Sequence, residues 1–158
     1  TWCDTAAIPY VVGPEKNLLE RHLLAVEETD ADTLMRVTAD SPFVPPAEID
    51  RLVREYMETD VDCVTNYTDQ MPVGTIVDVV DRTVLEALAE RGETHPLARL
   101  YDHPDQYDIR FSNNPRWTAL STAHLEVNTA DEYRAICEAF DAVGPDPLRM
   151  GELLVNNQ

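Results

Sequence analysis

The sequence predicts an α/β fold of three layers, in which a mostly parallel sheet carries helices on both faces. Short apolar runs that are typical of strands alternate along the chain with segments whose apolar residues recur at helical spacing. The chain has 158 residues, 44% of them hydrophobic, which is enough for one domain with a hydrophobic core. We therefore expect a single α/β domain over residues 1–158.

The expected helices begin at recognisable local signals. Pro46 suits the first turn of a helix over 46–59, and Thr129 and Glu132 predict a capping box for another helix. The residues expected on buried faces of these two helices are Ile49, Leu52, Val53, Tyr56, Met57, Tyr133, Ile136, Cys137 and Phe140. Further helices are expected at 15–28, 81–91, near 94–96 and at 148–156, with 1–7 as the end of an earlier helix.

The expected strands are short and apolar. They lie at 8–12, 33–37, 63–65, 75–80, 107–111 and 125–127. The strands between 75 and 127 follow one another closely, which leaves room for antiparallel additions to the sheet.

The charge is strongly one-sided. There are 30 acidic residues against 12 basic ones, the net charge is -18, and Lys16 is the only lysine. We favour adaptation to high salt, because at about 1 M salt the screening length is only about 3 Å and repulsion between carboxylates largely vanishes. An acidic interaction surface is the alternative. Nucleic acid is not an expected partner, because binding to phosphates needs clustered Lys and Arg.

The three cysteines indicate no disulfide or zinc site. Cys3, Cys63 and Cys137 form no CxxC pair, so we expect reduced, mostly buried thiols in the cytoplasm. The sequence contains no apolar run of membrane-spanning length and no recognisable signal peptide, so a membrane is not an expected partner.

The most informative segment is Arg36-Val37-Thr38-Ala39-Asp40-Ser41-Pro42, which follows a predicted strand. Ligands of open α/β sheets bind beyond the carboxyl ends of the strands, so Asp40 lies where a phosphate-bound metal ion would be held. The alternative is that Asp40 only caps its loop by accepting hydrogen bonds from local N–H groups.

This segment resembles the sugar-activating cytidylyltransferases, in particular the spore coat polysaccharide branch, which is related to CMP-Kdo synthetase and acylneuraminate cytidylyltransferase. The family pattern Arg-Val-Thr-Gly-Asp-x-Pro is followed by a helix opening Ile-Asp-x-Val, here 49–53. The resemblance implies a nucleotide-diphospho-sugar transferase-like fold. It begins near Ile8, so we expect the C-terminal two-thirds of that fold, truncated at the N-terminus and without the family's glycine-rich nucleotide loop.

The resemblance also implies the residues of the site. Asp40 and Asn128 would hold Mg²⁺, although the family motif Val-Asp-Thr-Pro-Glu-Asp has Asp where this chain has Asn128, and an amide binds the ion more weakly. Arg36 and Ser41 would contact the nucleotide. The residues expected to contact the sugar are Asn66, Gly74, Asp78 and His95.

Alternatives remain for the sugar-contacting residues. The segment 74–79 corresponds to the family's Gly-Leu-Asp-Val-Glu-Val, but Ile76 replaces its first acid, and a plain buried strand explains Ile76 equally well. Turn chemistry explains Asn66. A position in the first turn of a helix explains His95.

The resemblance implies CTP-dependent activation of a sugar or sugar acid for surface polysaccharide synthesis, with release of pyrophosphate and a homodimer as the expected assembly. A non-catalytic relative that binds a sugar nucleotide, or only pairs with another subunit, is the alternative. A likeness of fold alone is a third, because fold does not determine function.

The charge balance generates a testable prediction. If the acidic surface is an adaptation to salt, raising KCl from about 0.1 M to about 1 M screens the repulsion between carboxylates and raises the midpoint of thermal unfolding. Circular dichroism measures this midpoint. A midpoint that does not change with KCl would instead favour the acidic interaction surface.

Overall fold

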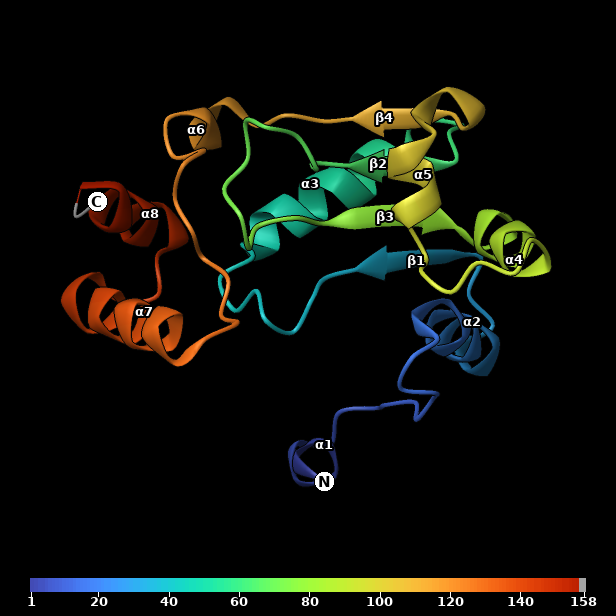
Figure 1. Ribbon diagram of the computed structural model, residues 1–158, viewed down its shortest axis with the longest axis horizontal. Helices are drawn as coiled ribbons and strands as arrows, with labels where there is room; N and C mark the ends of the chain where they lie inside the picture. The colour runs from blue at the N-terminus through green and yellow to red at the C-terminus, as the bar shows by residue number, and fades with distance from the viewer. Residues whose placement is uncertain (157–158) are drawn as a thin grey trace. The chain divides into compact units, whose positions relative to one another are not determined.

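The computed structural model describes residues 1–156 and has a mixed α/β architecture (Figure 1). The strands are β1 (Thr33–Arg36), β2 (Cys63–Thr65), β3 (Asp78–Asp81) and β4 (Ile109–Phe111). The helices are α1 (Trp2–Ala6), α2 (Leu18–Thr29), α3 (Pro46–Met57), α4 (Arg82–Glu90), α5 (Ala98–Asp102), α6 (Pro115–Thr118), α7 (Ala130–Val143) and α8 (Pro147–Asn156), with a 3-10 turn η1 (Pro104–Gln106). The expected α/β class is confirmed.

The four strands form one sheet in the order β1-β3-β2-β4. Figure 1 shows β3 running against the direction that β1, β2 and β4 share. The sheet therefore includes an antiparallel strand in the region between residues 75 and 127, where the sequence leaves room for one.

The chain forms two compact units. The first consists of Thr1–Leu34 and Val80–Ile109, and the second of Met35–Val79 and the chain from Arg110 onward. In the first unit, α2 packs against α4, and the backbone N–H of Leu19 donates to the carbonyl oxygen of Thr94 at 2.9 Å.

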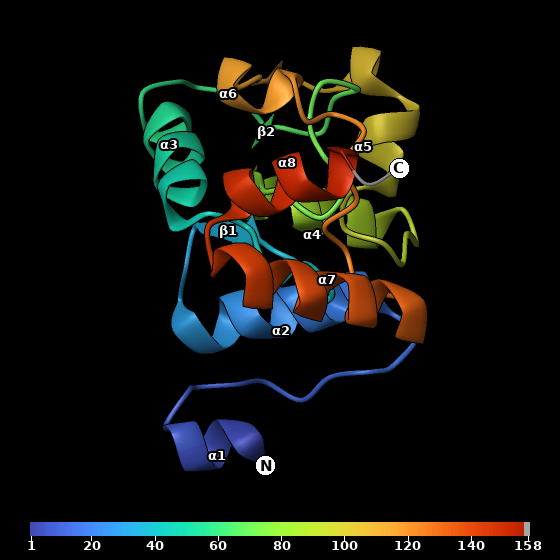
Figure 2. The ribbon, with the colours of Figure 1, turned by 90° about the vertical axis from the view of Figure 1, so that its left-hand side faces the viewer.

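The second unit contains two apolar clusters. One joins α3 to the sheet through Leu52, Val64, Val77 and Val79, all buried. The other surrounds α7 and α8, which lie side by side in Figure 2 and pack against each other. Its buried members include Trp117, Leu120, Leu125, Ile136, Ala139 and Met150.

The expected strand at 8–12 is wrong. Ile8, Tyr10, Val11 and Val12 are exposed, and none of residues 8–12 is in a strand. Pro9 gives a physical reason, because proline has no N–H to donate to a strand ladder. Helix α1, within the expected 1–7, has a capping box between Thr1 and Asp4.

The expected strand at 125–127 is also wrong. This segment is extended but bonds to two separate loops rather than to a strand: the N–H of Leu125 donates to Val73 O at 2.9 Å, and that of Val127 to Asp40 O at 2.8 Å. Near it lies one isolated parallel bridge between Val73 and His124.

Helix α7 buries only part of the face that was expected. Ile136 is buried as expected, together with Ala139, whereas Tyr133 is 60% exposed and Phe140 is 44% exposed. The small Ala139 lets α7 approach its neighbours, so the packed stripe is rotated away from the aromatic residues. Met57 of α3 is likewise exposed instead of buried.

The cysteines agree in part with expectation. All three are free thiols; Cys63 is buried, whereas Cys3 and Cys137 are half-buried. Burial, followed by the charges of Asp78 and Asp62, raises the pKa of the Cys63 thiol, so this cysteine stays protonated. Within residues 1–156, the helices lack the length and apolar character needed to cross a membrane.

Gly74 is required by a close approach of two backbone segments. Its φ is +85°, and a Cβ atom there would lie 2.5 Å from the carbonyl carbon of Leu125 and 2.6 Å from the nitrogen of Glu126. Only glycine avoids both the strained φ and the collision. Gly74 therefore lets the chain at 125–126 lie against the start of the 74–79 segment.

We expect Gly74→Ala to destabilise the protein more than Gly144→Ala. Gly144 has a similar φ of +77° with a ψ of −168°, a region almost confined to glycine, but nothing lies within 4 Å of a Cβ atom there, so its substitution costs only the backbone strain, about 1–3 kcal/mol. The collision at Gly74 should add at least about 1 kcal/mol. Equal free energies of unfolding of the two variants by denaturant titration would refute the proposed collision.

Candidate functional site

The loop that carries Asp40 is fixed by a backbone contact with the segment that carries Asn128. The N–H of Val127 donates to the carbonyl oxygen of Asp40 at 2.8 Å, and the N–H of Ser41 closes the turn onto Thr38 O at 3.1 Å. The structure thus brings together the two segments on which the metal site was predicted. The carboxylate of Asp40 is half-buried, and among residues 1–156 its one side-chain hydrogen bond is a long one, 3.3 Å from Ser41 Oγ.

Asn128 is held by two carboxylates. Its Nδ2 donates to Glu126 Oε2 at 2.9 Å, and its backbone N–H donates to Glu132 Oε2 at 2.8 Å. The hydrogen bond from the Asn128 backbone, with the one from the Thr129 side chain, lowers the pKa of Glu132. Because Glu126 occupies Nδ2, the oxygen of the amide is the atom left for a ligand.

Glu126 was not predicted from the sequence. Its signal is its position two residues before Asn128 in an extended segment, where side chains two apart share a face. Glu126 supplies a carboxylate, in addition to that of Asp40, from the segment that contacts the Asp40 loop.

The donors present are hard oxygen atoms, which suit Mg²⁺. Across residues 1–156, however, no three His, Cys, Asp or Glu side chains form a group that could hold a metal ion alone. Mg²⁺ usually takes only one or two carboxylates and fills its other positions with phosphate oxygens and water. The oxygen atoms that Asp40 and Asn128 offer are of the kind that Mg²⁺ takes when it arrives with a nucleotide, and they do not make a permanent protein-only site.

Two of the predicted binding residues contact each other. Arg36 Nη1 pairs with Asp78 Oδ2 at 3.2 Å, and the hydroxyl of Thr65 donates to Asp78 Oδ1 at 2.7 Å. Asp78 is only 1% exposed, so it needs these partners. The structure thus gives Arg36, expected at the nucleotide, a carboxylate partner, and joins it to a residue expected at the sugar.

Asn66 is buried, and its amide is fully engaged. Nδ2 donates to Thr75 O at 3.0 Å and to Glu48 Oε1 at 3.3 Å, while Oδ1 accepts from the N–H of Val77 at 2.8 Å. The side chain of Asn66, together with its backbone N–H, which donates to Val77 O at 3.4 Å, binds residues 75 and 77. Strand β3 follows and begins at Asp78 rather than at residue 75 as expected.

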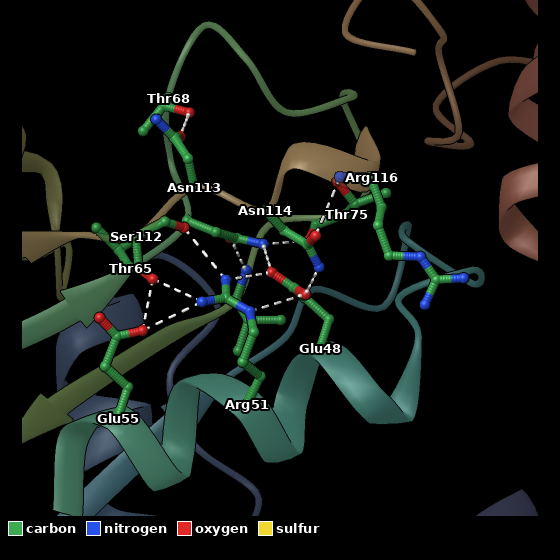
Figure 3. A network of polar contacts seen from close by, with 12 residues as sticks. Glu48, Arg51, Glu55, Thr65, Thr68, Thr75, Ser112, Asn113, Asn114 and Arg116 are labelled. Carbon is green, nitrogen blue, oxygen red and sulfur yellow. Dashed lines mark hydrogen bonds and ion pairs between the residues drawn. The ribbon is translucent and has the colours of Figure 1, made fainter. Parts of the chain in front are cut away.

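Glu48 and Arg51 form the centre of a buried polar network (Figure 3). Glu48 is 2% exposed and accepts a bidentate pair from Arg51, at 2.5 and 3.1 Å, and a hydrogen bond from Asn114 Nδ2 at 2.8 Å. Burial alone would raise the pKa of Glu48, but the hydrogen bonds from Arg51 and Asn114 and the charge of Arg51 outweigh burial and hold the pKa below its usual range.

The remaining donors of Arg51 extend the network to β4 and its end. Nη1 donates to Ser112 Oγ at 2.6 Å and to Glu55 Oε2 at 3.1 Å, and Nη2 donates to Ser112 O at 3.2 Å. Arg110 also pairs with Glu55. This network was not predicted from the sequence, because only the fold brings the residues of α3 next to those after β4.

The remaining sugar-contact prediction, His95, belongs to the first unit. Its Nδ1 accepts hydrogen bonds from the N–H groups of Leu97 at 3.2 Å and Ala98 at 3.0 Å. Leu97 is the N-cap residue of α5 and Ala98 its first residue, so the imidazole bonds to the start of a helix that begins at Ala98, later than the expected start near 94–96. His95 precedes this helix and is half-buried, so it is not a water-facing residue of the first turn, and its contact with a sugar stays a prediction.

The buried network should make Arg51 important for stability. Arg51→Met removes the charge that compensates buried Glu48, and we expect the free energy of unfolding to fall by about 3 kcal/mol or more. Arg54→Met on the same helix is the control, because Arg54 is exposed. If the free energy of unfolding falls equally in both variants in denaturant titrations, Arg51 does not compensate the buried charge of Glu48.

The pH dependence of stability should follow from the pKa of Glu48. Because the pKa is lower in the folded than in the unfolded protein, where it is near 4.5, Glu48 stabilises the fold above that pH and ceases to do so as the pH falls through the folded-state value. Glu48→Gln should therefore flatten the fall in unfolding free energy below pH 4.5. A fall as steep as that of the parent protein would contradict the assignment.

Comparisons with known proteins agree with this architecture. The sequence model of the cytidylyltransferase family matches residues 10–149. The spore coat polysaccharide biosynthesis protein SpsF of Bacillus subtilis is 24% identical over 141 residues, which cover 85% of this chain and 58% of SpsF. The uncharacterized protein MJ1063 of Methanocaldococcus jannaschii is 20% identical over 161 residues, which cover 98% of this chain and 66% of MJ1063.

A solved structure shares the fold. The structure of a cytidylyltransferase from Leptospira borgpetersenii serovar Hardjo-bovis superimposes with a TM-score of 0.86 at 16% sequence identity, over 98% of this chain and 69% of that one. The matched part of this chain spans less than two thirds of the length of SpsF and of MJ1063.

The sequence model of the cytidylyltransferase family matches residues 10–149, which are most of the residues of this chain. This chain therefore belongs to the cytidylyltransferase family.

Proposed function

We propose that this chain takes part in CTP-dependent activation of a sugar for surface polysaccharide synthesis. Membership of the cytidylyltransferase family supports the use of CTP, and the name of the relative SpsF supports the polysaccharide context. The observation that carries the proposal is the hydrogen bond of Val127 to Asp40, which places the Asp40 loop beside the segment of Asn128.

In the proposed reaction, a sugar hydroxyl attacks the α-phosphate of CTP. A bond forms between the sugar oxygen and the α-phosphorus, the bond from that phosphorus to the bridging oxygen of the β-phosphate breaks, and pyrophosphate leaves with that electron pair. The hydroxyl proton passes to solvent, and the product is a CMP-sugar, or a CDP-sugar where the attacking oxygen belongs to a sugar phosphate. Such transfers depend on positioning and charge stabilisation more than on covalent chemistry.

The role proposed for Asp40 is to hold Mg²⁺ together with the oxygen of Asn128. A bound Mg²⁺ would neutralise the charge that gathers on the phosphates. Asp40 suits the role because its carboxylate is accessible and makes one long hydrogen bond within the described chain. Asn128 suits it because Glu126 engages its amide nitrogen, which leaves the amide oxygen for an ion.

A non-catalytic binding module is the second candidate, and specific contacts favour it. Ile76, which replaces an acid of the family motif, packs against the apolar cluster around Leu125 and Ile136. Asn66 engages its whole side-chain amide within the protein. These contacts leave fewer polar groups for a sugar than the resemblance implies. Whether the chain binds CTP distinguishes the enzyme from the non-catalytic module.

Titration calorimetry in about 1 M KCl tests the proposal. We expect CTP to bind only when Mg²⁺ is present, and Asp40→Asn to weaken this binding about tenfold or more, because it removes the ligand charge. Asp69→Asn, an exposed position outside the site, is the control. Binding that is unchanged in Asp40→Asn would remove Asp40 from the site, and no heat at millimolar CTP with Mg²⁺ would favour the non-catalytic module.

Restoring the carboxylate of the family motif should strengthen the site. Asn128→Asp adds a second charged oxygen ligand, so we expect the affinity for Mg²⁺ in the presence of CTP to rise about fivefold or more. The affinity is measured by titrating Mg²⁺ into the protein with CTP. An unchanged or lower affinity would show that position 128 does not contact the ion.

A further inference from the structure

A cavity of about 390 Å³ lies in the second unit, between the starts of α3, α6 and α8. The lining residues that carry the argument are Glu48, Arg51, Asn114, Arg116, Trp117 and Asp146. None of its described lining residues is a predicted contact of the metal ion, the nucleotide or the sugar. A molecule bound there would therefore be a separate ligand, whose binding does not depend on the proposed reaction.

The buried pair of Glu48 and Arg51 uses its polar groups within the protein. Arg51 donates once from Nε and twice from each terminal nitrogen, which is every N–H group that a guanidinium has. The two carboxylate oxygens of Glu48 accept from Arg51, Asn66 and Asn114. The charges of this pair cancel, so the pair leaves ligand binding to its neighbours.

Trp117 is a buried donor without an acceptor. The residue is only 3% exposed, and its indole Nε1 makes no hydrogen bond within residues 1–156. An indole N–H can only donate, and when buried it usually finds a partner. Because Trp117 lines the cavity, a ligand oxygen there can supply the acceptor that the indole lacks.

Arg116 brings an uncompensated positive charge to the cavity. Figure 3 shows its side chain extending away from the buried network, and its guanidinium pairs with no carboxylate in the described part of the chain. Beside it, Asn114 Nδ2 gives one N–H group to Glu48 and keeps the other. These donors suit a carboxylate, which can accept two parallel hydrogen bonds from a guanidinium.

The charge balance favours a ligand with one negative charge. Asp146 also lines the cavity, although its Oδ1 already accepts from the N–H groups of Leu148 at 3.0 Å and Arg149 at 3.4 Å. A phosphate dianion would meet this carboxylate with only the guanidinium of Arg116 to compensate. The lining also includes Pro45, Pro147 and Leu148, whose apolar surfaces suit the hydrocarbon part of a ligand.

We propose that this cavity binds a small monocarboxylate with an apolar ring or chain. The ligand carboxylate would accept hydrogen bonds from the guanidinium of Arg116, the indole N–H of Trp117 and the second N–H of Asn114. The apolar part would lie against Pro147 and Leu148. Binding needs neither CTP nor Mg²⁺, so the site goes beyond the proposed function and does not rest on it.

The indole N–H signals in NMR spectra test the site directly. The chain has two tryptophans, and Trp2 is an internal control because it is 75% exposed and belongs to the first unit. Benzoate is the probe, and benzamide is its neutral counterpart. Phenyl phosphate is the dianionic counterpart at about pH 8.

At one fixed KCl concentration, we expect benzoate to shift the signal of Trp117 but not that of Trp2, with an affinity of about 1 mM. Benzamide and phenyl phosphate should each bind about fivefold more weakly or worse, because the first lacks the charge and the second adds one.

Two substitutions make the test specific. Arg116→Met should weaken benzoate binding about fivefold or more, because it removes the uncompensated guanidinium. Arg149→Met is the matched control, since Arg149 is likewise exposed, lies in the same unit and is outside the described lining of the cavity. Both substitutions change exposed side chains, so neither should unfold the protein.

Four results would overturn the site. They are an unmoved Trp117 signal at about 50 mM benzoate, equal shifts of both tryptophans, equal binding of benzamide, and an equal effect of Arg116→Met and Arg149→Met. Tighter binding of phenyl phosphate would overturn the assignment to a monocarboxylate. Each of these results leaves the proposed function standing, because that function is tested by the binding of CTP with Mg²⁺.

Discussion

One backbone hydrogen bond, from the N–H of Val127 to the carbonyl oxygen of Asp40 at 2.8 Å, holds together the two segments of the candidate site. It joins the loop at the end of β1 to the extended segment that leads into α7. The metal ligands proposed at 40 and 128 both depend on this junction. Gly74 assists it, because the absence of a side chain lets residues 125 and 126 approach.

The buried network around Glu48 fixes a different part of the second unit. Glu48 accepts hydrogen bonds from Arg51, Asn114 and Asn66, and the amide oxygen of Asn66 in turn accepts from the N–H of Val77. A buried ion pair adds little net stability compared with an apolar packing of the same volume, but breaking it is costly. Here the network joins α3 to Asn66 after β2 and to Ser112 and Asn114 after β4.

The sequence predicted correctly the helix starts that depend on residues within one turn of the helix end. Pro46 marks the start of α3, and the pair Thr129 and Glu132 marks that of α7, because their signals lie within one helical turn. Pattern alone failed where tertiary contacts decide. The apolar run at 8–12 contains Pro9 and forms no strand, and the aromatic residues of α7 lie outside the core because Ala139 permits a different packed stripe.

Only the residues of the candidate site that belong to family motifs could be predicted from the sequence. The resemblance pointed to Asp40 and Asn128, and the fold joins their segments. Glu126 and Glu48 could not be assigned from the sequence, since a carboxylate gains its role from neighbours that are distant in the chain. We propose that Asp40 and Asn128 hold a divalent ion against a nucleotide. Paramagnetic relaxation by Mn²⁺ added together with CTP can locate that ion: the amide signals of residues 39–41 and 126–129 should broaden first, and broadening centred elsewhere in the chain would rule out this site.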